Sequence, residues 1–123
     1  MSDLRFFGEQ NGSENQPALA ITTLPVEGND EWMKTLVAER LAACVTKLPS
    51  AVSTYRWQEK IVTDDENVWM IKTTLAKTEA LVAEIRKNHP YEVPEIIVFA
   101  INAINESYWQ WLLDSTSDSF PHT

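Results

Sequence analysis

The segment at residues 89–95 reads HPYEVPE and concentrates side chains that can bind a metal or a polar ligand. The imidazole of His89 suits copper and zinc. Two carboxylates three positions apart in an extended chain point to opposite faces, so Glu92 and Glu95 are not expected to hold one ion together. A turn at Pro90 would bring Glu92 towards His89, which makes these two the better pair. The alternative is that His89 only caps the end of a helix.

The one cysteine of the chain, Cys44, is the third candidate metal ligand. A thiolate binds Cu(I) well, but a lone cysteine more often serves as a small buried apolar side chain. One histidine is not a chelate, and the other one, His122, lies next to the C-terminus. Neither the Cys/His spacing of a zinc site nor an HExxH motif occurs in the sequence.

Aromatic and basic residues alternate on two segments that have the pattern of neighbouring strands. Tyr55 and Trp57 point to one face and Arg56 to the other, while Lys72 lies on the second segment. Packing across the strands explains these residues without a ligand. The run of acids at residues 64–66 interrupts the apolar pattern of the second segment. A solvated bulge or turn is the simpler interpretation of this run, and a cation site is the alternative.

The elements that must position these residues follow from periodicity, capping residues and prolines. Asn29 or Asp30 can cap the first helix, Asn105 can cap the last, and Pro49 should bend the second strand. The strand that follows the HPYEVP segment does not alternate and is expected to be buried on both faces. The expected strands are 17–25, 44–58, 61–74 and 95–101, and the expected helices lie within 27–43, 75–88 and 106–113.

This order, β-α-β-β-α-β followed by a helix, predicts an α+β, ferredoxin-like fold with an antiparallel sheet and an extra C-terminal helix. We expect one domain at residues 17–114 between flexible tails at 1–16 and 115–123. Two helices cover one face of such a sheet. The other face needs a cover, which Trp57, Trp69, the last helix or other subunits can supply.

Composition narrows the function classes. The formal net charge of −8 repels phosphate backbones, so nucleic-acid binding is not expected. No stretch is apolar enough for a membrane span or a signal peptide, and one cysteine allows no intrachain disulfide. These absences favour a soluble cytoplasmic protein. With three glycines and no phosphate loop, and with no nucleophile elbow, the motifs do not argue for an enzyme.

Four motifs, ERLAACVTKLPSAVSTYRWQ, WMIKTT, HPYEVPEII and YWQWL, occur in an order and at spacings that resemble the CutA family of divalent-cation tolerance proteins. The resemblance covers roughly residues 17–113. It implies a ferredoxin-like subunit in a tight homotrimer, with three sheets packed about an axis as in PII-type signalling proteins. It also implies a link to tolerance of copper and other divalent metals. The sequence departs from the family where Ser50 and Glu59 replace usual glycines, and at Thr46, Ala100 and Ile104.

Three functions therefore remain open. The first is a homotrimer that binds copper or another divalent metal in metal homeostasis, with Cys44, His89 and Glu92 as candidate ligands. The second is a PII-like sensor of a small anionic metabolite at a cleft between subunits, and the third is a trimeric scaffold for protein interactions. The resemblance implies that hairpins lean across neighbouring subunits, so the candidate cleft residues are Tyr55, Arg56, Trp57, Lys72, Tyr91 and Glu95.

Overall fold

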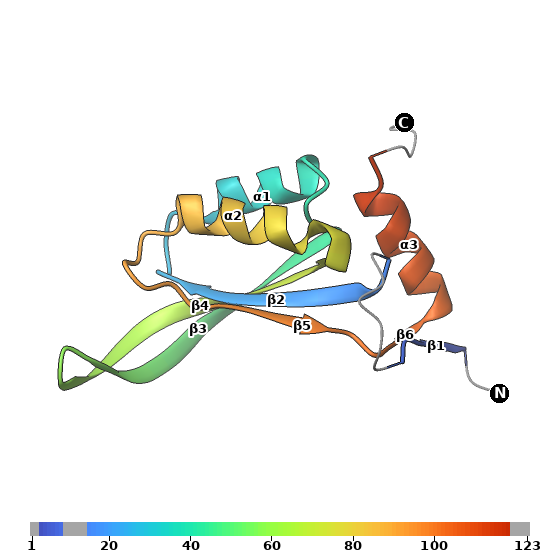
Figure 1. Ribbon diagram of the computed structural model, residues 1–123. Coiled ribbons are helices and arrows are strands. Elements are labelled where there is room, and N and C mark those ends of the chain that lie inside the picture. The colour runs from blue at the N-terminus through green and yellow to red at the C-terminus, as the bar shows by residue number, and fades with distance from the viewer. Residues whose placement is uncertain (1–2, 9–14, 119–123) are drawn as a thin grey trace.

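The computed structural model describes residues 3–8 and 15–118. Its main sheet is antiparallel, has the strand order β3-β4-β2-β5, and carries α1 and α2 on one face (Figure 1). This arrangement confirms the α+β, ferredoxin-like prediction. The elements of this unit are β2 (Pro17–Leu24), α1 (Asp30–Ala38), β3 (Cys44–Trp57), β4 (Lys60–Thr74), η1 (Leu75–Lys77), α2 (Thr78–Asn88) and β5 (Ile96–Ala100).

The main core lies between the two helices and the sheet. Met33 and Leu36 of α1 and Leu81 and Ile85 of α2 are buried there at helical spacing. Trp69 of β4 packs into the same cluster. Trp69 therefore faces the helices, and the expectation that it could help to cover the opposite face is wrong.

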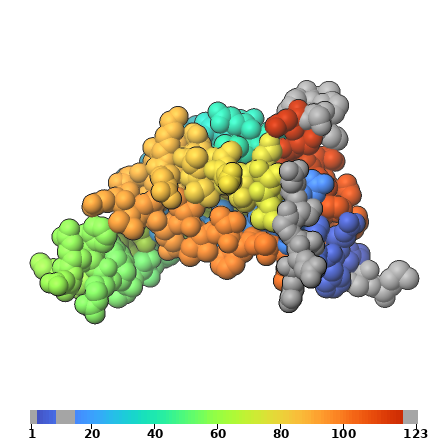
Figure 2. Space-filling view, viewed as in Figure 1, coloured from blue at the N-terminus to red at the C-terminus, as the bar shows by residue number. Residues whose placement is uncertain are grey.

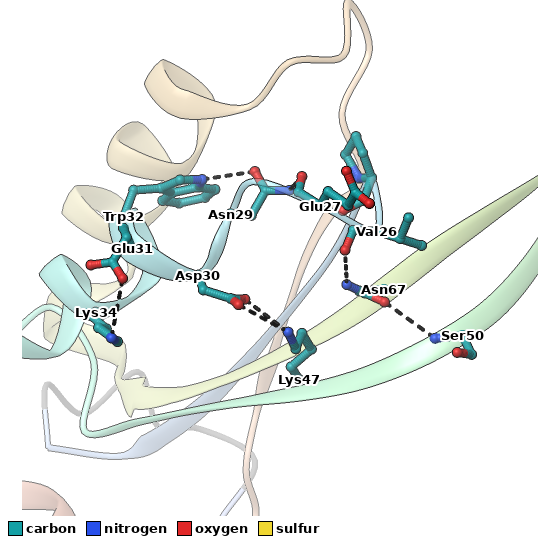
Figure 3. Close-up of polar contacts among 11 residues, drawn as sticks. Val26, Glu27, Asn29, Asp30, Glu31, Trp32, Lys34, Lys47, Ser50 and Asn67 are labelled. Carbon is teal, nitrogen blue, oxygen red and sulfur yellow. Dashed lines mark hydrogen bonds and ion pairs between the residues drawn. The ribbon is translucent and has the colours of Figure 1, made fainter.

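Polar contacts fix the start of α1 and the bend in β3 (Figure 3). Asn29 is the N-cap residue, but its amide oxygen accepts a hydrogen bond from Trp32 Nε1 at 3.0 Å instead of capping the helix. The amide of Asn67 joins two segments: it donates to Val26 O at 3.2 Å and accepts from Ser50 N at 3.3 Å. These contacts hold the bend of β3 close to the loop before α1.

β3 and β4 form a long hairpin that extends beyond the rest of the sheet (Figures 1 and 2). The register shifts between Leu48 and Ala51, which confirms the bulge expected at Pro49. Ser50, Gln58 and Glu59 have φ of 63°, 50° and 66°, the left-handed region that favours glycine. Ser50 and Glu59 replace glycines that the resemblance led us to expect, and the conformation explains that preference.

The acids at residues 64–66 lie inside the continuous strand β4, so the interpretation as a bulge or turn is wrong. The register across this part of the hairpin is regular, with Asp64 opposite Ser53 and Glu66 opposite Ala51. Glu66 is only 5% exposed. The break in the apolar pattern therefore marks a buried carboxylate and not the end of a strand.

The face of the sheet opposite the helices is apolar and uncovered in the single chain. Ile97 and Phe99 of β5, opposite Ile21 and Leu19 on β2, are 44% and 48% exposed. β5 is an edge strand, so the expectation that it is buried on both faces is wrong for the single chain. Leu48, on the same face at the other edge, is 47% exposed.

A second, two-stranded sheet lies at one end of the molecule, next to the last helix (Figure 1). β1 (Leu4–Phe6) pairs antiparallel with β6 (Ala103–Asn105), which leads directly into α3 (Glu106–Thr116). Phe7 packs edge-on against Trp109 with ring centroids 5.5 Å apart, and Arg5 lies 4.5 Å from a Trp109 ring. Part of the segment expected to be a tail is thus a strand, and α3 extends past the expected domain end at 114. The remainder of both predicted tails lies outside the described residues.

Candidate functional site

A cavity of about 670 Å³ lies between the β3–β4 hairpin and the segment that precedes β5. In Figure 2 these two parts of the chain, green and orange, adjoin each other at one end of the molecule. The hairpin contributes an aromatic and hydroxyl-bearing wall, and the segment contributes the acids of the HPYEVPE motif. The lining residues are Thr23, Ser53, Thr54, Tyr55, Trp57, Glu66, Pro90, Tyr91, Glu92, Val93 and Glu95.

The segment at residues 89–95 is held beside β2 by hydrogen bonds at both of its ends. At the start, His89 Nε2 lies 2.8 Å from Thr23 O, and at the end Thr22 Oγ1 donates to Glu95 O at 2.7 Å. Between these contacts the chain bends at residues 91–93 and is not extended. Glu92 and Glu95 therefore line the same cavity, contrary to the expectation that they diverge.

Glu66 and Tyr91 form the polar centre of this cavity. The Tyr91 hydroxyl donates a hydrogen bond to Glu66 Oε2 at 2.8 Å. Burial of the phenol, together with the bond to Glu66 and its negative charge, raises the pKa of Tyr91 well above the usual range. Tyr91 consequently remains a proton donor, and it orients the buried carboxylate of Glu66.

A second phenol–carboxylate pair lies further along the hairpin. Tyr55 donates a hydrogen bond to Asp64 on the neighbouring strand, and this bond raises the pKa of Tyr55. Because Tyr55 and Asp64 sit on adjacent strands of one regular ladder, the pair fixes the Tyr55 ring at the wall of the cavity.

His89 is buried and both of its ring nitrogens have partners. Nδ1 accepts from Tyr91 N at 3.2 Å, so Nε2 carries the proton and donates to Thr23 O. The His89 ring also lies against the Tyr91 ring, with centroids 4.9 Å apart. Burial lowers the pKa of His89 below its ordinary value. The side chain that looked most like a metal ligand thus anchors the Tyr91 turn to β2.

Cys44 is half-buried at the other end of the sheet. Its Sγ lies 3.7 Å from Thr46 Oγ1, and its strand position is opposite Lys72, which in turn is opposite Leu19. Leu19 and Thr23 are four positions apart on β2, about 13 Å at the rise of a strand. The fold of the chain therefore does not bring Cys44 and His89 together. Within residues 3–8 and 15–118, no group of three or more histidine, cysteine or acidic side chains could hold a metal ion.

The cleft candidates divide into two sets. Tyr55, Trp57, Tyr91 and Glu95 line the cavity, together with Glu92. Arg56 alternates with its neighbours on β3 and does not contribute to the lining. Lys72 is six positions from Glu66 along β4, about 20 Å away. The lining formed by the described residues contains three glutamates and no lysine or arginine.

Sequence reasoning missed Glu66, the most buried acid of the cavity. Its signal was the acid within an otherwise apolar strand, which we interpreted as a turn. The partner that makes burial possible, Tyr91, is 25 positions away in the sequence. Local periodicity does not reveal such a pair, because only the tertiary fold brings the HPYEVPE segment beside β4.

Comparison with known proteins adds information that the geometry does not carry. The sequence model of the family described as "CutA1 divalent ion tolerance protein" matches residues 18–115. A "Divalent-cation tolerance protein CutA" of Thermus thermophilus is 43% identical over 83 residues, covering 68% of this chain and 81% of the relative. "Protein CutA 1, chloroplastic" of Oryza sativa is 35% identical over 112 residues, covering 89% of this chain and 63% of the relative. The match covers 63% of this plant relative and 60% of "Protein CutA, chloroplastic" of Arabidopsis thaliana, so the chain spans about three fifths of the length of both.

Solved structures show the same fold. The structure of CutA from Synechococcus elongatus has a TM-score of 0.82 at 31% identity, covering 94% of this chain and all of that one, 100%. The crystal structure of CutA1 from Oryza sativa has a TM-score of 0.79 at 34% identity, covering 85% of this chain and 96% of that one. Among the described residues, none of the helices is long and apolar enough to cross a membrane. The cytoplasmic location stays a prediction.

Proposed function

Because the chain belongs to the CutA1 family of divalent ion tolerance proteins, we propose that it acts in divalent-cation tolerance as a metal-binding homotrimer. The observation that carries this proposal is the family match over residues 18–115, which includes all of the ferredoxin-like unit except its first residue, Pro17. The name shared by the relatives describes tolerance of cations and not a reaction, which supports a binding role over a catalytic one.

Assembly is supported by the apolar face that one subunit leaves uncovered. Ile97 and Phe99 are nearly half exposed, and so is Leu48 at the opposite edge of the sheet. A soluble subunit rarely exposes such a contiguous apolar surface, and an obligate interface typically buries on the order of 2,000 Å² or more. Three copies packed through this face would bury it.

Metal binding by one subunit is not supported by the arrangement of Cys44, His89 and Glu92. The nitrogens of His89 are engaged, and Cys44 lies far from the cavity. Glu92 is exposed and lines the cavity, so it remains available as a ligand. We therefore infer that divalent-cation binding, including that of copper, requires ligands from more than one subunit.

Native mass spectrometry with one equivalent of Cu²⁺ per chain tests this inference. The expected result is a trimer that holds copper in a fixed ratio and loses it when Glu92→Gln and Cys44→Ser are combined. Glu79→Gln, an equal loss of charge on the exposed side of α2, is the control. A graded series of copper adducts that is the same in all variants would instead show adventitious binding to an acidic surface.

The second candidate function is the binding of a small molecule in the cavity, as expected for a PII-like sensor. It is favoured by one observation, the volume of about 670 Å³, which lies within the range of small-molecule pockets. The anionic ligand that we expected depended on Arg56 and Lys72, and neither contributes to the lining. A thermal-shift screen of charged and neutral metabolites tests this candidate, because a ligand that binds the folded state raises Tm.

A further inference from the structure

The cavity between the hairpin and the HPYEVPE segment is lined by aromatic and acidic side chains, and the binding of a divalent cation does not require the aromatic ones. We propose that it binds an organic cation, a small molecule with an ammonium group. This proposal extends the second candidate function and does not require a bound metal; of the candidate metal ligands, only Glu92 lines the cavity. It rests on three features of the wall: a buried carboxylate, aromatic rings, and the lack of a chelating set.

The buried carboxylate is Glu66, which is 5% exposed and forms part of the cavity wall. Its Oε2 accepts the hydrogen bond from Tyr91, whereas no hydrogen bond within the described part of the chain reaches Oε1. A carboxylate in such surroundings interacts more strongly with a cation than a solvated one, because water screens the charge less. Glu92 and Glu95 add negative charge to the same wall, and the lining formed by the described residues offers no basic side chain to neutralise it.

The aromatic rings are Tyr55, Trp57 and Tyr91, all of which line the cavity. The face of an aromatic ring attracts an ammonium group, most strongly when the ring belongs to tryptophan. The bonds to Asp64 and Glu66 fix the two tyrosine rings, so their positions are set before a ligand arrives. Aromatic walls around a carboxylate are the arrangement that recognises alkylated ammonium groups.

The same wall is unsuited to a bare metal ion within one subunit. The described residues contain no cluster of three or more histidine, cysteine or acidic side chains in position to hold one. A cavity of about 670 Å³ is also far larger than a coordination sphere, whose ligands lie within about 2.0–2.6 Å of the ion. A larger ligand that contacts the walls by dispersion and carries one positive charge fits both the volume of the cavity and the lack of a chelating cluster in the described residues.

Calorimetric titration of the assembled protein with choline, compared with 3,3-dimethyl-1-butanol, tests the proposal. These probes have the same shape at the head, but only choline carries a charge. We expect saturable choline binding that is at least about tenfold tighter than that of the neutral probe. Glu66→Gln preserves an acceptor for Tyr91 and should weaken choline binding about tenfold. Trp57→Leu should also weaken choline binding about tenfold, and because Trp57 is exposed, this substitution should leave the fold intact. Glu79→Gln should bind choline as the wild type does.

Other outcomes would overturn the proposal. If both probes bind equally, or if Glu66→Gln changes nothing while the variant keeps the wild-type Tm, the charge of Glu66 does not select the ligand. If glutarate binds and choline does not, the cavity is a small-molecule site for anions, and only the cation proposal fails. If none of the three probes binds, the cavity is not a small-molecule site, and the second candidate function fails with it.

Discussion

Glu66 shows how a single residue can tie the stability of the fold to the chemistry of the cavity. An isolated buried carboxylate is costly, and a hydrogen bond from a neutral donor offsets part of that cost. Tyr91 supplies the donor, and His89 holds the turn that brings Tyr91 into place. The histidine and the tyrosine of the HPYEVPE segment thus act on Glu66, which lies on strand β4.

The raised pKa of Tyr91 leads to a first prediction, at alkaline pH. Burial and the bond to Glu66 keep the Tyr91 proton in the folded protein above about pH 10, where the unfolded chain releases it. This contribution to stability is therefore complete below about pH 10 and declines as the pH rises further. In an ultraviolet absorbance titration, Tyr91→Phe should remove the last tyrosine to ionise.

The other two tyrosines provide the comparison for this titration. The pKa values of Tyr55 and Tyr108 are also raised, through the bond to Asp64 and through burial respectively. Tyr55→Phe should remove an earlier component and leave the last one in place. Three tyrosines that ionise together at about pH 10 in the folded protein would contradict the hydrogen-bond network of the cavity.

At the scale of elements, the turn of the β3–β4 hairpin carries conformational strain. Gln58 and Glu59 both have positive φ, which matches a type I′ turn but disfavours side chains other than asparagine, aspartate and glycine. Glu59→Gly should raise the free energy of unfolding by about 0.5–1 kcal/mol, measured by chemical denaturation.

The control for this turn is a glycine introduced where φ is negative. Lys34→Gly, at an exposed position inside α1, should lower the free energy of unfolding by about 1 kcal/mol. If both glycines destabilise the protein to a similar extent, strain at Glu59 is not what limits the hairpin.

The N-terminal segment, β1 and the Phe7 that follows it, gives the second prediction at this scale. Phe7 is 7% exposed and belongs to the cluster that holds α3, whereas the neighbouring Phe6 is 68% exposed. Phe7→Ala should therefore lower the free energy of unfolding by about 3 kcal/mol. Phe6→Ala should change it by less than about 0.5 kcal/mol. Equal effects of the two substitutions, measured by denaturation, would show that Phe7 does not secure α3.

The elements that sequence predicted well are those with strong local signals. Periodic apolar residues located α1 and α2, and Pro49 located the bulge in β3. Sequence did not predict β1, because three residues in a polar segment carry no periodic pattern and become a strand only by pairing with β6. It also placed Trp69 on the wrong face, because alternation shows which residues share a face but not which face the helices cover.

The candidate site was predictable to a similar degree. The types of its residues were visible in the HPYEVPE motif and on the hairpin, and five of the residues proposed there do line one cavity. Two features decide which of these residues share a wall of the cavity. One is the bend at residues 91–93, and the other is the distance along β4 between Glu66 and Lys72. Both are properties of tertiary structure, so Lys72 was grouped with residues from which the fold separates it. The separation of Arg56 was visible in the sequence, because strand alternation already placed it on the face opposite Tyr55 and Trp57.

For the whole molecule, the proposed trimer makes the open face of the sheet its most sensitive surface. Phe99→Glu would place a charge on the exposed β5 side of that face and should yield monomers in size-exclusion chromatography with light scattering. Val26→Glu, at an exposed loop position 47% accessible to solvent, should leave the trimer intact. A trimer that persists in Phe99→Glu would show that the subunits associate through another surface.

The composition of β5 has a consequence for a subunit that has not yet found its partners. Its sequence, IIVFA, contains no charge and no proline, and it forms an unprotected edge of the sheet. Such edges template the growth of amyloid-like aggregates, and proteins usually protect them with charges, prolines or bulges. This chain has none of these protections within β5, so in the proposed trimer a newly synthesised subunit would depend on rapid encounter with other copies. Variants such as Phe99→Glu that retain most of the IIVFA segment but dissociate the proposed trimer should therefore precipitate at high concentration.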